Sequence, residues 1–337
     1  MRALILKNKN KLSIEERELA ALSDFDVLIK VEVACVCGSD FRLLNQDKIH
    51  DIVLGHEFSG TVLRSGKGVK EKLVGKRVTV FPMFSCLDCD SCKSERHRDC
   101  DNKISLGWDL DGAFANEVVV DSRFVIELPD DISFAEGALV EHLSCGYRVA
   151  QEILNTGVAK DTPIAIFGDG PIGLSNILFL KLLDFNNISV IGRYDSRLKL
   201  ACEFGAKRVT KDIQTIHNSE MLVVSAPSGS DLLELISRNP IHYIVPQTRI
   251  EEKTVLNEIL RRNIKMGRGF AYVKDDFYQV INFLQGNREL SKKMLSREMT
   301  IYEFANEVNF SSLKKPEYKI FFRPNKNYGN GLELHRA

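Results

Sequence analysis

A glycine-rich turn between an apolar strand and an apolar helix constrains the fold of this chain more than any other feature. Residues 163–167 form a short apolar run, residues 168–173 read Gly-Asp-Gly-Pro-Ile-Gly, and a helical run follows through residue 182. In this context Gly-x-Gly-x-x-Gly predicts a dinucleotide-binding βαβ unit whose helix N-terminus faces a pyrophosphate. The alternative is a glycine-rich turn of some other α/β protein. The residues predicted to hold the cofactor at this turn are Gly168, Gly170, Pro171, Ile172 and Gly173.

Strands and helices are expected to alternate along the rest of this region. Further strands are predicted at residues 188–191, 221–225 and 241–245, and helices at 231–237 and 251–262. Such alternation is typical of an α/β fold with a doubly wound parallel sheet, the Rossmann fold. We therefore predict a Rossmann dinucleotide-binding domain over residues 148–269.

The end of the second strand of this domain bears on the choice of cofactor. An NAD-preferring site places Asp or Glu there, bonded to the ribose 2′-hydroxyl, but position 192 is glycine here. Gly192 leaves room for a 2′-phosphate, Arg193 can bind it through charge-assisted hydrogen bonds, and Arg197 can add a second positive charge. These residues predict NADP(H) in preference to NAD(H). The alternative is that Asp195, which we expect to cap the next helix, binds the ribose and restores a preference for NAD.

Residues 1–147 differ in character, because short strand-like runs are separated there by turn signals. This pattern predicts a mostly β domain. After about residue 270 the chain is expected to return to that domain and to add a strand at residues 318–322. A length of 337 residues suits two domains, one of residues 1–147 with 270–337 and one of residues 148–269.

Three residues of types that bind zinc stand out in the first domain. Cys37 lies in Cys-Gly-Ser-Asp, His56 in Gly-His-Glu and Glu141 in Val-Glu-His-Leu. A thiolate, an imidazole and a carboxylate make a three-ligand set that leaves a fourth position open, as in catalytic zinc sites. Asp40 is placed to accept the free N–H of His56 and to fix its tautomer. The alternative is a buried cysteine and an unrelated histidine in a turn.

Neighbouring residues complete this predicted site. Ser39 is expected to take up a proton from the substrate, and Glu57 is expected to stay behind the ligands, approaching the metal at most transiently. His142 is a rival to Glu141 as a ligand, whereas Cys145 is expected in the core or in a pocket wall. The predicted catalytic residues are Cys37, Ser39, His56 and Glu141.

Four further cysteines follow the pattern Cys-x2-Cys-x2-Cys-x7-Cys. Four thiolates at such spacing can close a tetrahedron around zinc with no open position, which makes the site structural. The crowded spacing and the expected absence of a secretion signal disfavour disulfides. An iron–sulfur cluster is an alternative that needs companions this chain lacks. The predicted ligands are Cys86, Cys89, Cys92 and Cys100.

Taken in this order, residues 37–40, residues 55–57, the four-cysteine lobe and the glycine-rich turn resemble the zinc-dependent medium-chain alcohol/polyol dehydrogenases. The resemblance runs over nearly the whole chain and is weakest after about residue 225. It implies a GroES-like, mostly β catalytic domain beside the Rossmann domain, two zinc ions per chain, and a homodimer or homotetramer. Glu141 is similar to the sorbitol-dehydrogenase-like branch, in which Glu replaces the third cysteine ligand.

One position departs from the pattern of this family. Five residues after Cys37, many relatives carry a histidine that extends the proton relay, but this chain has Arg42. Arginine cannot accept a proton at neutral pH, so the relay is expected to end at Ser39 or to reach solvent through water. Arg42 is expected either to bind an anionic group of substrate or cofactor or to lie in solvent. Trp108, the only tryptophan, is expected either to wall the substrate cleft or to serve packing.

The composition gives no sign of a nucleic-acid or membrane-surface partner, because 46 lysines and arginines balance 46 aspartates and glutamates. No apolar run reaches the length of a membrane span, and the sequence opens directly into a strand-like segment. Both features favour the cytoplasm.

These expectations combine into a zinc-dependent, NAD(P)-linked oxidoreductase that interconverts a secondary alcohol, such as a polyol, sugar alcohol or cyclitol, and its ketone. One alternative is an NADPH-dependent ketose-phosphate or simple carbonyl reductase. An alternative of another class is a non-catalytic redox sensor that binds zinc and a dinucleotide. The expected partners are a small-molecule alcohol or ketone and further copies of the chain, without nucleic acid or membrane.

Overall fold

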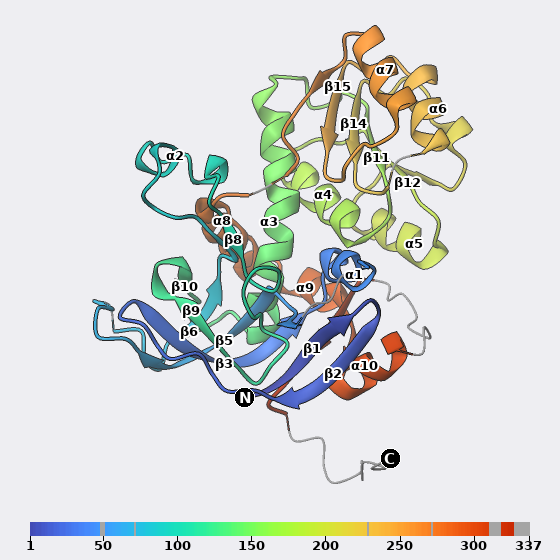
Figure 1. Ribbon diagram of the computed structural model, residues 1–337. Helices are drawn as coiled ribbons and strands as arrows, with labels where there is room; N and C mark the ends of the chain where they lie inside the picture. Colours follow the sequence, from blue (N-terminus) through green and yellow to red (C-terminus); the bar gives the residue numbers. More distant parts are fainter. Residues whose placement is uncertain (48–50, 71, 228, 271, 310–317, 327–337) are drawn as a thin grey trace. The chain divides into compact units, whose positions relative to one another are not determined.

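The computed structural model describes residues 1–47, 51–70, 72–227, 229–270, 272–309 and 318–326. The chain divides into two compact units, which are coloured by sequence in Figure 1. Two of the changes of unit fall inside helices α3 (Phe134–Asn155) and α8 (Lys274–Gly286), and the others bound the short excursion Arg96–Arg98. Compact units need not coincide with functional domains, so the domain limits after residues 147 and 269 remain a prediction. The first unit comprises Met1–Glu95, Asp99–Leu139 and Leu284–Ala337, and the second comprises Arg96–Arg98 and Val140–Phe283.

The first unit is built mainly from antiparallel strands. Its strands are β1 Arg2–Asn8, β2 Lys11–Glu16, β3 Asp26–Cys35, β4 Ile52–Val53, β5 Glu57–Ser65, β6 Arg77–Val80, β7 Met83–Phe84, β8 Ile104–Ser105, β9 Glu117–Asp121, β10 Val125–Glu127, β17 Leu295–Met299 and β18 Lys319–Phe322. A three-stranded sheet has the order β2-β1-β4, and a seven-stranded sheet has the order β10-β6-β5-β3-β18-β17, with β9 paired to the first half of β3. Strands β7 and β8 form a separate ribbon.

Short helices connect these strands. They are α1 Gly38–Leu44, α2 Asp90–Lys93, α9 Arg288–Met294 and α10 Ile301–Asn309, with 3-10 turns η1 His97–Asp99 and η2 Ser122–Phe124. The connections carry the candidate ligands, because α1 begins directly after Cys37 and α2 directly after Cys89.

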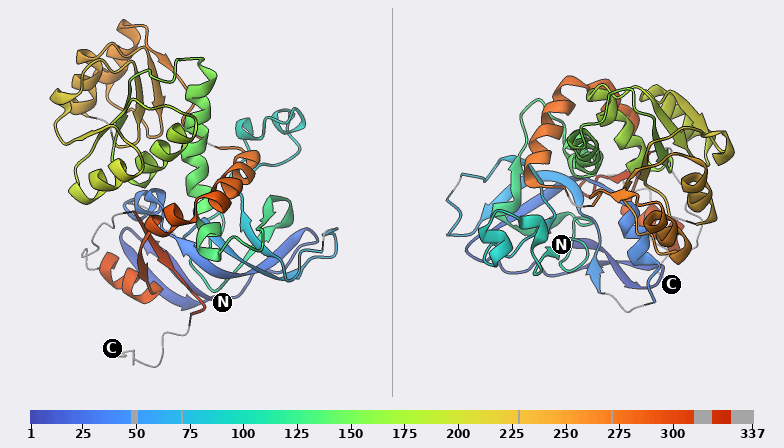
Figure 2. Two further views of the ribbon diagram at one scale, coloured as in Figure 1. Left: turned by 180° about the vertical axis from the view of Figure 1, so that it is seen from behind. Right: turned by 90° about the horizontal axis from the view of Figure 1, so that it is seen from above.

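The far end of the chain completes the seven-stranded sheet. Strand β18 pairs with β3 in antiparallel fashion, with Phe321 opposite Cys35, and with β17 in parallel fashion. Figure 2 shows this return, in which the red end of the chain lies against the blue strands of the first unit. Phe322 packs edge-on against Phe114 and Phe304, with ring centroids 4.9 and 5.1 Å away. The segment that closes the sheet is therefore also part of the core.

The second unit holds a six-stranded parallel sheet. Its elements are β11 Ile164–Phe167, α4 Pro171–Leu182, β12 Ile188–Ile191, α5 Asp195–Glu203, β13 Arg208–Thr210, η3 Ile213–Thr215, β14 Met221–Val224, α6 Ser230–Arg238, β15 Tyr243–Pro246, α7 Lys253–Arg261 and β16 Lys265–Met266. The strand order is β13-β12-β11-β14-β15-β16, and every neighbouring pair is parallel. This is the 3-2-1-4-5-6 order of doubly wound dinucleotide-binding sheets, so the predicted Rossmann fold is confirmed.

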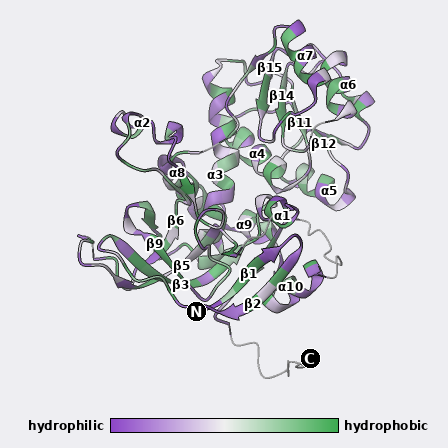
Figure 3. Cartoon of the chain, in the orientation of Figure 1, coloured by the Kyte–Doolittle hydropathy of each residue, from purple (hydrophilic) through white to green (hydrophobic). Residues whose placement is uncertain are grey.

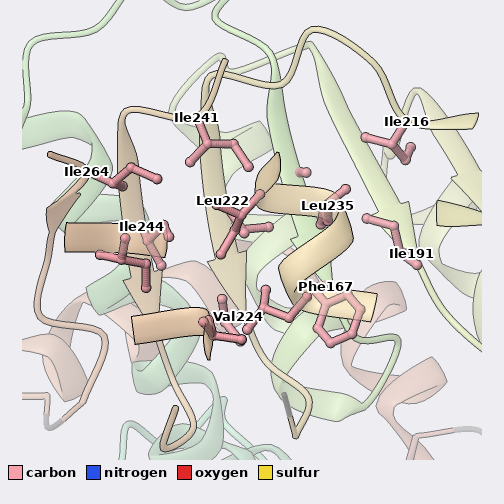
Figure 4. Packing of buried hydrophobic residues seen from close by; sticks show 14 residues of the cluster. Phe167, Ile191, Ile216, Leu222, Val224, Leu235, Ile241, Ile244 and Ile264 are labelled. Atoms are coloured by element: carbon pink, nitrogen blue, oxygen red, sulfur yellow. The ribbon is translucent and has the colours of Figure 1, made fainter. Parts of the chain in front are cut away.

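The core of the second unit explains why its strands read as continuous apolar runs. Leu222 and Val224 of β14 and Ile244 of β15 pack against Leu235 of α6 and the neighbouring helix α7 (Figure 4). Strands of a parallel sheet are covered on both faces, so both sets of alternating side chains are buried. Figure 3 shows the resulting hydrophobic colouring along β14 and β15.

Candidate metal centres and nucleotide-binding turn

The first candidate site lies where β3 ends and β5 begins. These strands are antiparallel and place Cys35 opposite Glu57, so the residues just beyond, Cys37 and His56, come to the same edge of the sheet. The ligand atoms of Cys37, His56 and Glu57 all lie within 4.8 Å of one another. The structure thus brings together two predicted ligands with Glu57, which the sequence placed behind them.

Two residues of α1 orient the His56 ring. Its Nδ1 lies 3.7 Å from Asp40 Oδ1, and its Nε2 lies 3.4 Å from Ser39 Oγ. Asp40 is itself fixed, because its Oδ2 accepts a hydrogen bond of 2.8 Å from the backbone N–H of Cys37. Burial raises the pKa of the Asp40 carboxyl to about 6, although the nearby His56 opposes the shift. The ring therefore presents Nδ1 to a carboxyl group and Nε2 to the side where Ser39 lies.

A buried lysine that the sequence analysis missed pairs with Glu57. Lys319 Nζ lies 2.6 Å from Glu57 Oε1 and donates to the Val36 carbonyl at 3.2 Å. Burial by itself lowers the pKa of this lysine, but the charges of Glu57, Cys37 and Cys35 outweigh it, so the pKa of Lys319 is raised. A lysine within the apolar run Tyr-Lys-Ile-Phe-Phe was the available signal for a buried charged partner.

The donor atoms of this group fit a zinc ion. Glu57 Oε2 is buried and has no hydrogen-bond partner in the described part of the chain, which leaves a carboxylate oxygen for a cation. Desolvation and the Glu57 charge raise the pKa of the Cys37 thiol. A bound cation acts in the opposite direction and deprotonates a coordinating thiol. Thiolate, imidazole and carboxylate are all zinc ligands.

Glu141, the third predicted ligand, belongs to the second unit, where it lies on α3. It is buried, and the Tyr272 hydroxyl donates a hydrogen bond to its Oε1. His142, its rival in the sequence analysis, is buried too, and the Cys145 thiol lies 3.9 Å from the Glu141 carbonyl oxygen. Carboxylates that bind metals are commonly held by such a hydrogen bond. Tyr272 was not foreseen, because no local pattern links it to a residue 131 positions away.

The four predicted structural ligands form the second candidate centre. The sulfur atoms of Cys86, Cys89, Cys92 and Cys100 all lie within 4.8 Å of one another. Cys86 Sγ is 3.5 Å from Cys100 Sγ and 3.9 Å from Cys92 Sγ. Thiolates about 2.3 Å from a tetrahedral zinc are about 3.8 Å apart, whereas disulfide sulfurs are only about 2.05 Å apart. Backbone N–H groups of Asp88 and Cys89 lower the pKa of the Cys86 thiol to about 6.

The glycine-rich turn of the second unit has the geometry that its sequence predicts. Gly168 follows β11 with a φ of +121°, and α4 begins at Pro171 with Ile172 next in its first turn. A Cβ on Gly173 would lie 2.0 Å from the Gly168 carbonyl oxygen, whereas one on Gly170 would meet nothing within 4 Å. Gly173 is therefore needed for close packing, and Gly170 leaves open space at the helix N-terminus, where a phosphate is favoured.

Asp169, inside this turn, is the residue that the sequence analysis overlooked. Its Oδ2 accepts hydrogen bonds of 2.8 Å from the backbone N–H groups of both Arg193 and Tyr194. A Cβ on Gly192 would lie 2.4 Å from the Asp169 Cβ. The space beside Gly192, which was expected to admit a 2′-phosphate, is thus filled at that point by Asp169. An aspartate between two glycines of the turn was the available signal.

The other residues of the predicted ribose site lie at the start of α5. Arg193 is exposed, and the buried Arg197 guanidinium lies over the Tyr194 ring, 4.9 Å from its centroid. The expectation that Asp195 caps α5 was wrong, because Tyr194 holds the cap position and Asp195 is the first helical residue. The Asp195 carboxylate pairs with Lys211 at 2.7 Å, since the chain turns back toward it after β13.

A polar network links the ends of β14 and β15. Asn176 Nδ2 donates to Gln247 Oε1 at 2.7 Å, and the Ser225 hydroxyl donates to the same oxygen at 2.8 Å. Asn176 Oδ1 is buried and has no hydrogen-bond partner among the described residues. The loop from residue 225 thus carries polar groups at the carboxyl edge of the sheet, which is the ligand-binding edge of doubly wound folds.

The chain is similar to one known protein family and to several dehydrogenase-related proteins. Residues 23–130 match the family model described as the alcohol dehydrogenase GroES-like domain. The chain is 31% identical over 220 residues to the starvation-sensing protein RspB of Escherichia coli K12, an alignment covering 64% of each chain. It is 30% identical over 247 residues to sorbitol dehydrogenase of Bacillus subtilis, covering 71% of this chain and 69% of that enzyme.

The fold has a close counterpart among solved structures. The crystal structure of the alcohol dehydrogenase RspB from Escherichia coli CFT073, complexed with NADH, superposes with a TM-score of 0.82 and 25% identity. The match covers 96% of this chain and 99% of that one. Both predicted fold parts, the GroES-like domain and the parallel nucleotide-binding sheet, are thereby confirmed. Within the described parts of the chain, no helix combines the length and apolar character needed to cross a membrane.

Proposed function

This chain belongs to the zinc-dependent medium-chain alcohol/polyol dehydrogenases, a family of NAD(P)-linked oxidoreductases, and on that premise we propose the reaction that it catalyses. The chain interconverts a secondary alcohol, namely a polyol, a sugar alcohol or a cyclitol, and the corresponding ketone by hydride transfer. The observation that carries this proposal is the grouping of Cys37, His56 and Glu57 beside the Ser39 hydroxyl.

The proposed catalytic zinc ligands are Cys37, His56 and Glu141, with Glu57 behind them. When bound, the zinc ion polarises the alcohol oxygen and lowers its pKa. The proposal is supported by Glu57 Oε2, which has no hydrogen-bond partner among the described residues. It is also supported by the thiol, imidazole and carboxylate groups that lie together where β3 ends and β5 begins. The pairing of Glu57 with Lys319 supports its place behind the ligands, because one of its two oxygens is already engaged.

The protein side chains around this site have separate tasks in the proposed mechanism. Ser39 takes the proton from the alcohol during oxidation and returns it during reduction, because its hydroxyl both accepts and donates. Asp40 holds the His56 ring with Nε2 on the Ser39 side. Arg42 cannot continue the relay, so the proton leaves Ser39 through water.

The four-cysteine group is proposed to hold a structural zinc ion. Sulfur separations of 3.5 and 3.9 Å support a tetrahedral ion rather than disulfides. The group has no open position, so its ion contributes to folding and takes no part in the reaction.

The proposed cofactor is NADP(H) in preference to NAD(H). The exposed Arg193 supports this choice, as does the pairing of Asp195 with Lys211, which keeps that carboxylate away from a ribose. When bound, the nicotinamide would supply or accept the hydride of the reaction. The Asp169 carboxylate opposes this choice, because its negative charge lies at the end of β12 and would repel a 2′-phosphate there.

The assembly and location of the protein are proposed from the family. We propose a cytoplasmic homodimer or homotetramer that acts on a small-molecule alcohol or ketone, with domains at residues 1–147 with 270–337 and at residues 148–269. Light scattering of the purified protein measures the assembly, and a monomer at micromolar concentration would contradict it.

A screen of cofactor oxidation tests the reaction. Zinc-loaded protein is mixed with NADPH or NADH and with neutral ketoses, ketose phosphates and cyclitol ketones. Turnover of a polyhydroxy ketone is expected. Turnover of simple carbonyl compounds alone would favour the reductase alternative. Tight binding of NADPH without turnover of any substrate would favour the redox sensor.

A further inference from the structure

The side chain of Arg42 is held against the only tryptophan of the chain. The Arg42 guanidinium carbon lies 5.8 Å from the centroid of the Trp108 ring, within the range of a cation–π interaction. Arg42 lies on α1, is exposed, and comes three residues after Ser39. Residues three apart in a helix lie on the same side, so Arg42 and Ser39 share a face of α1.

The backbone that carries Trp108 packs against the backbone just before His56. A Cβ on Gly107 would lie 3.0 Å from the backbone nitrogen of Gly55, the residue that precedes His56. The Gly107 N–H also donates to the Leu110 carbonyl at 2.7 Å, which closes the loop. The Trp108 ring and the His56 ring thus come from two backbone segments in direct contact.

The acidic groups nearest to Trp108 in the sequence are engaged elsewhere. Asp109 Oδ2 accepts the Ser105 N–H at 2.8 Å, and Asp111 pairs with Arg17 at 3.0 Å. Among the residues that the structure describes, no carboxylate lies within ion-pair distance of Arg42. The Arg42 guanidinium is therefore positioned by an aromatic face while its charge stays available.

From this arrangement we propose that Arg42 and Trp108 form an oxyanion subsite for the substrate. The substrate class is a polyol or ketose that carries a phosphate ester or a carboxylate in addition to the reacting secondary alcohol. A guanidinium that lies over an indole ring without an ion-pair partner has N–H groups available for paired hydrogen bonds to two oxygens. This inference rests on the proposed function for its reaction but not for the binding of the anion.

Steady-state kinetics with matched substrates test the subsite. A neutral ketose, its phosphate ester and the corresponding keto acid are compared in the wild type, Arg42→Met and Arg42→Lys. One of the two anionic substrates is expected to have the highest kcat/KM in the wild type. Arg42→Met should raise its KM about ten- to hundredfold with little change in kcat, the effect of losing a charged hydrogen bond. Arg42→Lys should recover part of the loss.

A matched control is available on the same unit. Arg123 is also exposed and also lies over an aromatic ring, with its guanidinium carbon 5.4 Å from the Phe25 centroid. Arg123→Met should leave the KM of every substrate unchanged. A preference for phosphate esters alone identifies a phosphate, and a preference for keto acids alone identifies a carboxylate. Equal kcat/KM for the neutral and both anionic substrates, or an unchanged KM in Arg42→Met, would overturn the subsite.

A binding measurement separates this inference from the proposed reaction. Trp108 is the only tryptophan, so its fluorescence reports on contact with Arg42 without any turnover. Titration with inorganic phosphate and with a hexitol phosphate should give a saturable change in emission in the wild type and Arg123→Met. The change should be lost in Arg42→Met. If Arg42→Met responds like the wild type, the subsite is refuted even where turnover is found; if the response is lost while no substrate is turned over, only the reaction is refuted.

Discussion

At the scale of single residues, the first unit contains a buried and paired set of charges. Lys319 and Glu57 are at most 2% exposed in their side chains and lie 2.6 Å apart. Removing one member of such a pair leaves an uncompensated charge in a low-dielectric interior. The pair engages Oε1 of Glu57 and leaves its Oε2 without a hydrogen-bond partner among the described residues.

Replacement of Lys319 should therefore destabilise the protein strongly. Lys319→Met is expected to lower the free energy of unfolding by about 3–5 kcal/mol, measured by urea denaturation of the metal-free protein. Adding Glu57→Gln should restore part of the loss, since the unpaired charge is then removed. The exposed pair of Lys76 and Glu127 is the control, and Lys76→Met should change the free energy of unfolding far less, because exposed ion pairs contribute little to stability. Similar losses in both lysine variants would show that burial of the pair is not the cause.

Asp169 offers a test of the cofactor choice. Asp169→Asn keeps an oxygen that can accept both N–H groups but removes the charge near the strand end. The ratio of kcat/KM for NADPH to that for NADH should rise about three- to tenfold, since a negative charge repels a 2′-phosphate. Asp169→Ala should also lose stability, about 1.5–3 kcal/mol for hydrogen bonds to a charged group.

The exposed Asp161 on the same unit provides the comparison for this experiment. Asp161→Asn removes the same charge without touching the strand end and should leave the cofactor ratio unchanged. A ratio that falls in Asp169→Asn would mean that the carboxylate assists NADPH binding, contrary to the prediction.

At the scale of elements, the sequence predicts contacts between residues close together in the chain and misses contacts between residues far apart in it. The turn at residues 168–173 was predictable because three glycines, a strand and a helix lie within one short stretch. Asp169 was missed because its partners come 24 and 25 residues later, after another strand. Lys319 was missed because its partner is 262 residues away, and only the pairing of β18 with β3 brings them together. The helix α5 was expected, but the residue that caps it was misjudged by one position.

The four-cysteine lobe is built from very short helices and strands. Helix α2 has four residues, and the strands β7 and β8 beside it have two residues each. Elements this short do not hold together in water by themselves. The lobe is therefore expected to depend on its metal for order.

Replacement of a cysteine in this lobe should lower the thermal stability of the protein and leave its catalytic activity largely unchanged. Cys92→Ser removes a buried sulfur of the group and should lower the thermal midpoint by several degrees, because metal binding contributes to folding free energy. Activity measured well below that midpoint should stay close to the wild-type value. Cys202→Ser is the control, since Cys202 is an exposed cysteine outside the group. A variant that keeps its midpoint but loses kcat would place this lobe in the reaction.

At the scale of the whole molecule, the two candidate centres predict the metal content. The protein as purified should hold two zinc ions per chain, and Cys37→Ser and Cys92→Ser should each hold one. Cys37→Ser should stay folded, with an unchanged circular dichroism spectrum, and should lose essentially all turnover. Metal analysis by mass spectrometry checks all three proteins. An active Cys37→Ser protein with full metal content would contradict the assignment of the open site.

Strand β18 is synthesised long after strand β3, with which it pairs. Strand β18 pairs with Ala34 and Cys35 at the end of β3, yet Lys319 is added to the growing chain 262 residues after Glu57. At about 5–20 residues per second, a ribosome needs roughly 13 to 52 seconds for that interval. Throughout it, the nascent first unit exposes an unpaired strand edge and an acidic group without its lysine. Such edges invite pairing with other chains, so the newly made protein is most vulnerable to aggregation, and most in need of a chaperone, before β18 emerges.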